Sequence, residues 1–417
     1  MDETSVHEAT MLGALYFSLS LILLFHAVGV TRPRWLGQTV GLIVSVPLLV
    51  VALFVPQLIG FGVLLTVAFV RFGVLDSTSG LVGLGLHGIS WALLARYLWQ
   101  LRRVVPILDG QPILDDEQPF PDHAGAGTVA GRAPSLWPTL SLRTSAMAHV
   151  EVIRNVVYRE VDGVRLRLDV YRPKRRSSDP SVLLPSILFV HGGAWVLGTK
   201  RQSPFLMFDL AAAGYVVFSV DYRLAPRFPL PAAIHDCKAA VVWVREHAAQ
   251  YGGTPEAVAM GNSAGGHLAA MLACSAVDRS LQPGFEDQDC SVRAGVILYG
   301  LSDITGIFDH HPSPIAHYLF EELVFCRRYR EHEEVFRRAQ PVSYLSAEIP
   351  PLLLIHGEHD VMIPIAESHN FYQRLKDAGA ARVHLCEVPL APHAFEIAPT
   401  PLQQRTQRII EGFLATL

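Results

Sequence analysis

Apolar residues dominate the first hundred positions of the chain, in three long runs. The runs cover residues 11–30, 40–70 and 81–99, and hardly a charge interrupts them. A run of about 20 apolar residues is long enough to cross a lipid bilayer as a helix. The middle run exceeds one ordinary span, and its prolines and glycines suit either one kinked helix or a tight helical hairpin. Residues 1–105 are therefore predicted to form a transmembrane helical domain with three or four spans.

The charges that flank these runs fit a membrane domain better than a cleaved leader. Acidic residues rather than a basic segment precede the first run, which argues against a signal peptide. Arg32 and Arg34 follow the first run, and Arg102 and Arg103 follow the third. With three spans, which we favour, the positive-inside rule places both pairs and the rest of the chain in the cytoplasm; four spans export it. The alternative, a buried helical domain of a soluble protein, is disfavoured because the runs contain so little charge.

The pattern changes after the third run. Residues 106–147 hold six prolines among small and acidic residues and are predicted to be a linker without a core. Residues 148–417 begin with two β-rich runs around Asp162 and Gly163, a strong hairpin signal. Short apolar runs then alternate with helical patterns, which predicts an α/β domain with a mostly parallel sheet covered on both faces. The predicted strands are 187–190, 216–220, 257–260, 294–298, 352–355 and 383–388, and the predicted helices are 205–213, 232–251, 365–378 and 403–414.

One segment departs from this alternation. Residues 303–340 are rich in aromatic, histidine and charged residues and are predicted to be an insertion over the carboxyl edge of the sheet. Tyr318, Phe320 and Phe325 form either the face of a lid or the insertion's own small core. The histidines His310 and His317 lack a third ligand at useful spacing, so no metal site is predicted there.

The overall composition excludes some functions. The chain has 417 residues, a net charge of -4 and no basic tract, so a nucleic-acid partner is not expected. Its five cysteines are scattered without the spacing of a metal site or a disulfide framework. No metal or organic cofactor is predicted.

The candidate chemistry begins at Ser263. It stands in a Gly-x-Ser-x-Gly motif between a short apolar run and an alanine-rich helical segment. This pattern predicts a sharp strand-to-helix turn in which Gly261 and Gly265 allow close backbone approach and the serine hydroxyl projects from the apex. The motif alone is weak, because small residues suit any tight turn, so its significance depends on suitable partners elsewhere in the chain.

Those partners follow other predicted strands, and ligands bind beyond the carboxyl ends of strands in such a sheet. The strand at 187–190 runs into Gly192, Gly193 and Ala194, whose backbone N–H groups, with that of Ala264, suit the binding of an oxyanion. The remaining candidates are Glu358 and Asp360 after the strand at 352–355, and His393 after the strand at 383–388. Asp360 is favoured over Glu358 because it lies later in its loop.

The motifs, taken together, resemble those of a known family. The sequences His-Gly-Gly-Ala-Trp, Asp-Tyr-Arg-Leu-Ala-Pro, Gly-Asn-Ser-Ala-Gly-Gly, His-Gly-Glu-His-Asp and His-Ala-Phe occur in the order found in α/β-hydrolases of the hormone-sensitive-lipase-like carboxylesterase branch. The resemblance implies that Ser263 is the nucleophile, Asp360 the acid and His393 the base. The layout also resembles that of membrane-anchored LipM-type bacterial esterases. Asn262 and Ala194 depart from the family pattern, which often has aspartate and glycine there.

Several neighbouring residues have less specific interpretations. Trp195 and Tyr222 are candidate substrate-pocket residues, although packing under the glycine loop is an equal alternative for Trp195. Asp221 and Arg223 are predicted to form a structural ion pair, and Asp236 is predicted to contact the same loop.

The sequence thus predicts a membrane-anchored serine carboxylesterase or lipase that acts on apolar or lipid-derived esters through an acyl-enzyme. Two alternatives stay open: an amidase, formamidase or prenylcysteine methylesterase with the same machinery, and a non-catalytic membrane scaffold with a hydrolase-like module. The expected partners are a small ester or lipid and, through residues 1–105, the bilayer of a bacterial cell.

Overall fold

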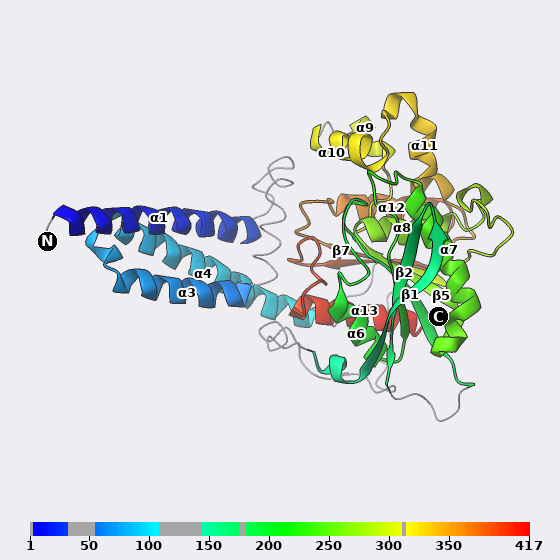
Figure 1. The fold of residues 1–417 in the computed structure, drawn as a ribbon, viewed down its shortest axis with the longest axis horizontal. Coiled ribbons are helices and arrows are strands. Elements are labelled where there is room, and N and C mark those ends of the chain that lie inside the picture. Colours follow the sequence, from blue (N-terminus) through cyan, green and yellow to red (C-terminus); the bar gives the residue numbers. More distant parts are fainter. Residues whose placement is uncertain (1–2, 32–54, 108–143, 175–180, 311–313) are drawn as a thin grey trace.

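The structure, a computed structural model, describes residues 3–31, 55–107, 144–174, 181–310 and 314–417. Figure 1 shows a bundle of long helices that extends away from an α/β domain. The described helices of this bundle are α1 (Glu3–Thr31), α3 (Val55–Arg71) and α4 (Thr78–Ile107). Two of its segments are long and apolar enough to cross a membrane by length and composition, namely Thr10–Gly29 and Thr78–Leu101, whereas α3 is a shorter apolar helix. About half of the middle run predicted from the sequence, residues 40–54, lies outside the described residues.

The bundle turns apolar side chains outward and polar ones inward. Phe61 and Leu64 of α3 are 65% and 71% exposed. Inside, the Tyr16 hydroxyl lies 2.8 Å from the Thr66 hydroxyl, and the Ser20 hydroxyl lies 2.6 Å from Nδ1 of His87. Hydrogen bonds between helices with apolar outer faces are typical of helices that pack in a lipid environment.

An eight-stranded sheet forms the centre of the α/β domain, in the order β1-β2-β4-β3-β5-β6-β7-β8. The strands β1 and β2 are antiparallel to each other, β2 is antiparallel to β4, and the remaining pairs are parallel. The sheet is therefore mostly parallel, as predicted. The strands are β1 (Val150–Val161), β2 (Val164–Pro173), β3 (Leu184–Val190), β4 (Val216–Val220), β5 (Gly253–Asn262), β6 (Ala294–Leu298), β7 (Leu352–Gly357) and β8 (Val383–Val388).

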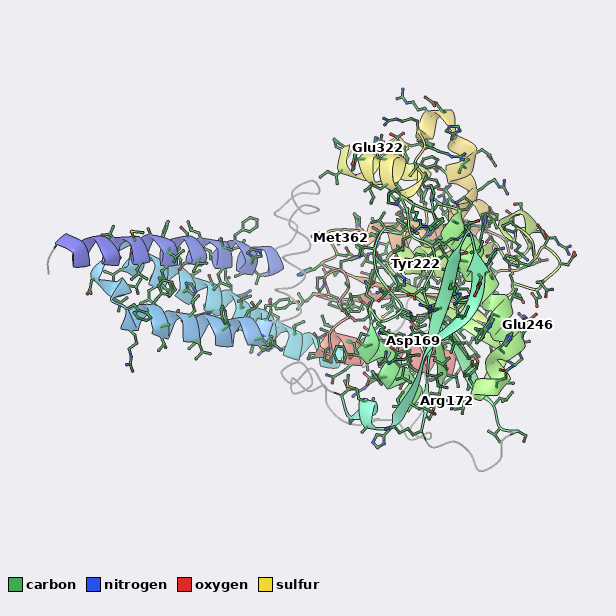
Figure 2. All side chains as sticks on the ribbon, in the orientation of Figure 1. Asp169, Arg172, Tyr222, Glu246, Glu322 and Met362 are labelled. Carbon is green, nitrogen blue, oxygen red and sulfur yellow. The ribbon has the colours of Figure 1, made fainter. Side chains whose placement is uncertain are left out.

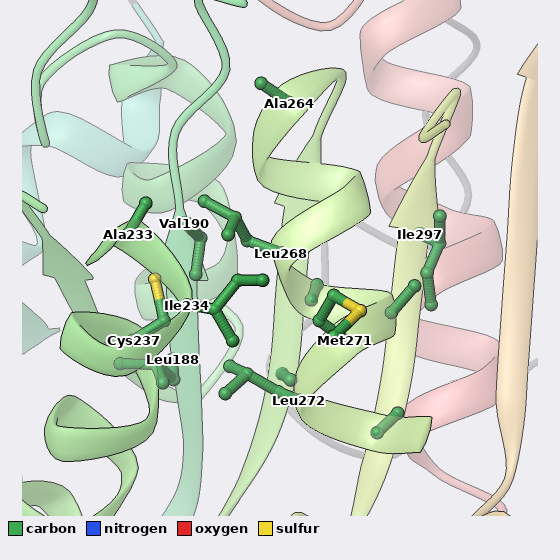
Figure 3. Close-up of a cluster of buried hydrophobic side chains, with 14 of the residues drawn as sticks. Leu188, Val190, Ala233, Ile234, Cys237, Ala264, Leu268, Met271, Leu272 and Ile297 are labelled. Carbon is green, nitrogen blue, oxygen red and sulfur yellow. The ribbon is translucent and has the colours of Figure 1, made fainter. Parts of the chain in front are cut away.

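Helices cover both faces of this sheet because successive side chains of each strand point to opposite sides. Leu188 of β3 belongs to the layer beneath α7, α8 and α12, whereas Phe189 belongs to the layer beneath α6 and α13. Figure 3 shows the first layer, in which Leu268 and Met271 of α8 pack among strand side chains. The helices are α6 (Pro204–Ala212), α7 (Ala232–His247), α8 (Ala264–Cys274), α12 (Ala366–Asp377) and α13 (Pro401–Leu414).

The hairpin signal is confirmed. Val161 of β1 pairs with Val164 of β2, and the two residues between them, Asp162 and Gly163, both have positive φ. Two-residue turns of this kind match the twist of the flanking strands. Short 3-10 turns complete the described secondary structure, at Val74–Asp76, Ser145–Ala148, Ala248–Tyr251, Arg279–Leu281, Tyr329–Glu331 and Pro341–Tyr344.

The predicted insertion forms a small helical layer above the sheet (Figure 1). Of its aromatic residues, Phe320 and Phe325 are buried in a core of the insertion. The Phe325 ring stacks there on the Phe336 ring, with centroids 3.8 Å apart. Tyr318, by contrast, is 60% exposed. The insertion contains α9 (Thr305–His310), α10 (Pro314–Tyr318), a π-helical turn (Leu319–Val324) and α11 (Glu333–Arg338).

The predicted ion pair between Asp221 and Arg223 is wrong. Arg223 instead donates to both carboxylate oxygens of Asp236, from Nε at 2.8 Å and from Nη2 at 2.9 Å. Asp221 accepts from the Lys200 ammonium at 2.6 Å. The two side chains leave an irregular loop and reach different parts of the domain, Asp221 toward Lys200 and Arg223 toward α7. The predicted contact of Asp236 with this loop is confirmed.

Replacing Arg223 by methionine tests the contribution of this buried pair. The Asp236 side chain is fully buried, and loss of its bidentate partner leaves it with the longer contact to the Arg159 guanidinium at 3.4 Å, so we expect the free energy of unfolding to fall by up to about 3–5 kcal/mol. Urea unfolding of the full chain in detergent, followed by tryptophan fluorescence, measures the change. Arg154→Met is the control, because Arg154 is half exposed, makes a single long contact of 3.4 Å with Asp169, and leaves Asp169 the shorter contact of 3.0 Å with Arg201. Equal losses in both variants would contradict the assignment.

Candidate active site

Ser263 occupies a strained turn between β5 and α8. Its backbone has φ 55° and ψ −120°, a conformation that non-glycine residues rarely adopt. The turn depends on close backbone approach at its two glycines. A Cβ on Gly261 would lie 2.2 Å from the carbonyl oxygen of Gly265, and one on Gly265 would lie 2.1 Å from that of Val190. The motif therefore holds the serine at the carboxyl edge of the sheet.

The structure brings the three predicted side chains together from three loops. The imidazole Nε2 of His393 lies 3.0 Å from the Ser263 hydroxyl oxygen, and its Nδ1 lies 2.6 Å from a carboxylate oxygen of Asp360. These distances are within hydrogen-bonding range. If the Nδ1 proton is donated to Asp360, Nε2 is free to accept the proton of Ser263.

Asp360 is held as a carboxylate by its surroundings. Its second oxygen accepts hydrogen bonds from the backbone N–H groups of Met362 and Ile363, each at 2.9 Å; Met362 is labelled in Figure 2. Burial by itself raises the pKa of the Asp360 carboxyl, but attraction to His393 and hydrogen bonds from His356 and His393 outweigh burial. Its pKa therefore lies below the ordinary value. Of the two acids that the sequence offered, Asp360 is thus the one whose carboxylate meets the imidazole.

The glycine loop after β3 lies directly beside the serine. A Cβ on Gly192 would lie 3.2 Å from Cβ of Ser263. Gly193, Ala194 and Trp195 all have positive φ, at 119°, 50° and 60°, and this unusual run of backbone bends the loop sharply. The loop and the first residue of α8, Ala264, thus bring backbone from two elements to the nucleophile.

The two candidate pocket residues lie under this loop. Trp195 is buried, and its indole N–H donates to Nδ1 of His267 at 3.2 Å. Tyr222, labelled in Figure 2, is also buried; its hydroxyl donates to the carbonyl of His191 at 3.0 Å, and its ring stacks on the His191 ring. These contacts make both side chains supports of the loop.

His267 links the nucleophile helix to the insertion. Because Nδ1 accepts from Trp195, Nε2 carries the proton and donates to the carbonyl of Ala339 at 2.7 Å. The ring of Trp195 also packs against Phe320 of the insertion, with centroids 5.6 Å apart. The insertion is therefore fastened to both the glycine loop and the helix that follows Ser263.

Sequence reasoning missed a buried polar cluster on the other side of the turn. Glu396 is fully buried and contacts Asn262, Tyr299 and Ser203. A glutamate three positions after the candidate base was the only available signal, and no local pattern marks such a residue as buried. Among the described residues, no group of three histidine, cysteine, aspartate or glutamate side chains is arranged to hold a metal ion.

Comparisons with known proteins agree with this fold. The model of the BD-FAE family matches residues 168–375. Esterase LipQ of Mycobacterium tuberculosis is 39% identical over 252 residues, which cover 60% of this chain and 59% of LipQ. The probable carboxylic ester hydrolase LipM of the same organism is 35% identical over 251 residues, which cover 60% of this chain and 57% of LipM. The matched region thus spans less than two thirds of either relative.

Solved structures give the same result. Thermogutta terrifontis esterase 2, phosphonylated by sarin, superposes with a TM-score of 0.55 at 27% identity, covering 64% of this chain and 94% of that one. The sheet order, the serine turn and this likeness define the domain as an α/β-hydrolase. These likenesses support placing this domain in the hormone-sensitive-lipase-like carboxylesterase branch of that superfamily.

The buried His267 predicts a pH dependence of stability. Burial lowers its pKa to about 4, although the hydrogen bond to Ala339 opposes this effect. An unfolded histidine titrates near 6.5, so between roughly pH 6.5 and 4 the unfolded chain binds a proton that the folded chain does not. The free energy of unfolding should therefore decrease as the pH falls through this window, by up to about 1.4 kcal/mol per pH unit for this group.

Urea unfolding of wild-type protein and His267→Gln between pH 5 and 7 measures this effect. We expect the slope of unfolding free energy against pH to be smaller in the variant, whatever its absolute stability. Parallel slopes in the two proteins would contradict the assignment of a neutral, buried His267.

Proposed function

We propose that the protein is a membrane-anchored serine ester hydrolase in which Ser263, His393 and Asp360 form the catalytic triad. The observation that carries this proposal is the continuous pair of contacts at 3.0 Å and 2.6 Å that joins the three side chains. A serine hydroxyl is a weak nucleophile unless a base takes its proton, and the base works best when a carboxylate fixes its tautomer. Relatives named as esterases support the same reaction class.

The mechanism follows from these contacts. Oγ of Ser263 attacks the ester carbonyl carbon while Nε2 of His393 takes the hydroxyl proton. The protonated His393 gives this proton to the departing alkoxide as the carbon–oxygen bond breaks, which leaves an acyl group on Ser263. Water, deprotonated by His393, then attacks the acyl carbon; as the bond to Oγ breaks, His393 returns the proton to Ser263 and the carboxylic acid is released. Asp360 stabilises the imidazolium at both stages because it stays ionised.

The backbone around Ser263 is proposed to bind the oxyanion. The N–H groups of Gly192, Gly193 and Ala194 lie in the loop beside the serine, and the N–H of Ala264 begins α8. Preorganised N–H donors stabilise the charge that develops on the carbonyl oxygen without reorganising during the reaction. Ala194 carries a methyl group where the family often has glycine, which narrows this side of the site slightly.

Apolar or lipid-derived esters are the proposed substrates, and the bilayer is the proposed partner. The outward-facing apolar residues of α1, α3 and α4 support insertion into a membrane, including Leu15, Ile22, Phe61, Leu64 and Ile89, each more than half exposed. Helix α4 also contacts the catalytic domain, where the buried Tyr97 hydroxyl donates to the carbonyl of Leu390 at 3.3 Å. This contact keeps the hydrolase domain next to the helices, and so next to lipid substrates.

Replacement of Ser263 by alanine tests the proposed nucleophile. We expect wild-type protein to react with a fluorophosphonate probe and to hydrolyse p-nitrophenyl esters, with rates that depend on acyl length. In Ser263→Ala, labelling should vanish and kcat should fall by more than about 10⁴-fold, because the proposed acyl-enzyme forms on the hydroxyl that this change removes.

The matched control is Ser186→Ala, which removes a buried hydroxyl bonded to the Thr254 carbonyl, far along β3 from the catalytic edge. It should keep full activity. Faster cleavage of aryl-formamides than of every ester would favour the amidase or formamidase alternative. An unlabelled wild-type protein would favour the non-catalytic scaffold.

Membrane insertion and sidedness form a separate prediction. Full-length protein expressed in bacteria should stay in the membrane pellet after an alkaline carbonate wash, because its apolar helix faces are solvated by lipid. With three spans, green fluorescent protein fused to the carboxyl terminus should fluoresce in the cytoplasm. Release into the wash would contradict insertion, and an active alkaline phosphatase fusion at the same position would contradict a cytoplasmic hydrolase domain.

A further inference from the structure

Glu396 is a buried carboxylate that the triad mechanism does not use. It lies three positions after His393 and is fully buried. Burying an ionisable group is costly unless hydrogen bonds satisfy it. One oxygen, Oε1, lies 2.6 Å from the amide nitrogen of Asn262 and 3.3 Å from the Ser203 hydroxyl. The other, Oε2, accepts a hydrogen bond from the Tyr299 hydroxyl.

The partners of Glu396 are joined directly to the candidate catalytic groups. Asn262 immediately precedes Ser263 and ends β5. The ring of Tyr299, which follows β6, packs against the imidazole of His393 with centroids 4.5 Å apart. A single carboxylate thus contacts the neighbour of the nucleophile on one side and the ring that supports the base on the other.

The hydrogen bonds to Glu396 determine which way the Asn262 amide faces. An amide nitrogen and two hydroxyls can all donate, so an ionised Glu396 accepts from each of them. The amide oxygen of Asn262 has no hydrogen-bond partner among the described residues. The orientation of this amide is therefore set by the nitrogen facing Glu396. An aspartate at this position, as the family often has, would bring two carboxylates to the contact.

We propose that Glu396 is a positioning residue that fixes the distance between Ser263 and His393 by holding Asn262 and Tyr299 from one point. This inference rests on the proposed function and deepens it. Glu396 touches neither substrate nor the reacting atoms. It acts through the backbone of the serine turn and through the ring beneath the imidazole. The pair of Asn262 and Glu396 forms one unit, so either residue tolerates exchange only together with the other.

A charge-swapped pair tests this unit in the full-length protein. In Asn262→Asp, two carboxylates face each other, and the displaced turn should lower kcat by about 10- to 100-fold with little change in KM. In the double variant Asn262→Asp, Glu396→Gln, the introduced glutamine amide can donate to the introduced carboxylate while its oxygen accepts from Tyr299. We expect kcat to recover to within about threefold of wild type, since contacts within one network are not additive.

The matched control brings two buried carboxylates together at a different position in the domain. Gln403 is fully buried and donates to a carboxylate oxygen of Asp209 at 3.1 Å, so Gln403→Glu also sets two buried carboxylates against each other. It should lower stability but leave kcat per labelled serine unchanged. Titration with the fluorophosphonate probe counts the folded, competent sites in every variant, so that loss of folded protein is separated from loss of turnover.

The outcomes are distinct. Turnover per labelled serine that is low in Asn262→Asp and recovers in the double variant supports the proposal. Wild-type turnover in Asn262→Asp, or a double variant no better than the single one, overturns it, as does an equal loss of kcat in Gln403→Glu. A wild-type protein that is neither labelled nor active overturns the proposed function itself.

Discussion

The close backbone approach around Ser263 is the constraint on which the site depends. Gly261 and Gly265 leave no room for a side-chain atom, and the serine between them adopts a conformation that costs free energy. The hydrogen-bonded neighbours β3, β5 and β6 hold this turn in place: the Ser263 N–H, for example, donates to the carbonyl of Leu298 at 2.9 Å. Because parallel strands end at a common edge, the loops after β7 and β8 deliver Asp360 and His393 to the same point.

Two buried carboxylates stand behind the turn, and each is satisfied differently. Asp360 is stabilised by His393 and two backbone N–H groups, which suits a group that faces an imidazolium. Glu396 is surrounded by neutral donors, and burial raises its pKa despite their hydrogen bonds and the attraction of His393. Asp360 stabilises the positive charge that develops on His393 during the proposed reaction, whereas Glu396 is proposed to hold the surrounding loops in place. Both would be costly to bury without these partners.

The sequence predicted those features that are determined by residues close together in the chain. Local patterns restrict the nearby backbone: the spacing of apolar residues, the Asp162–Gly163 turn and the small residues around Ser263. Strands, helices and motif positions were therefore predicted closely. Side-chain partners distant in sequence were not. The ion pair assigned to Asp221 and Arg223 proved wrong, because each side chain pairs with a residue more distant in sequence, Lys200 or Asp236. Glu396 went unnoticed for the same reason: its partners come from three other segments, and its burial depends on all of them.

The most direct test of the account is to find where the acyl group resides during turnover. The full-length protein would be mixed with a slowly deacylating p-nitrophenyl ester, quenched in acid within the first turnover, digested and mapped by mass spectrometry. We predict one acyl group per chain on the peptide that contains Ser263. When His393 is replaced, this adduct should form much more slowly. An acyl group on another residue, or hydrolysis without any covalent adduct at Ser263 under conditions in which deacylation limits turnover, would contradict the account.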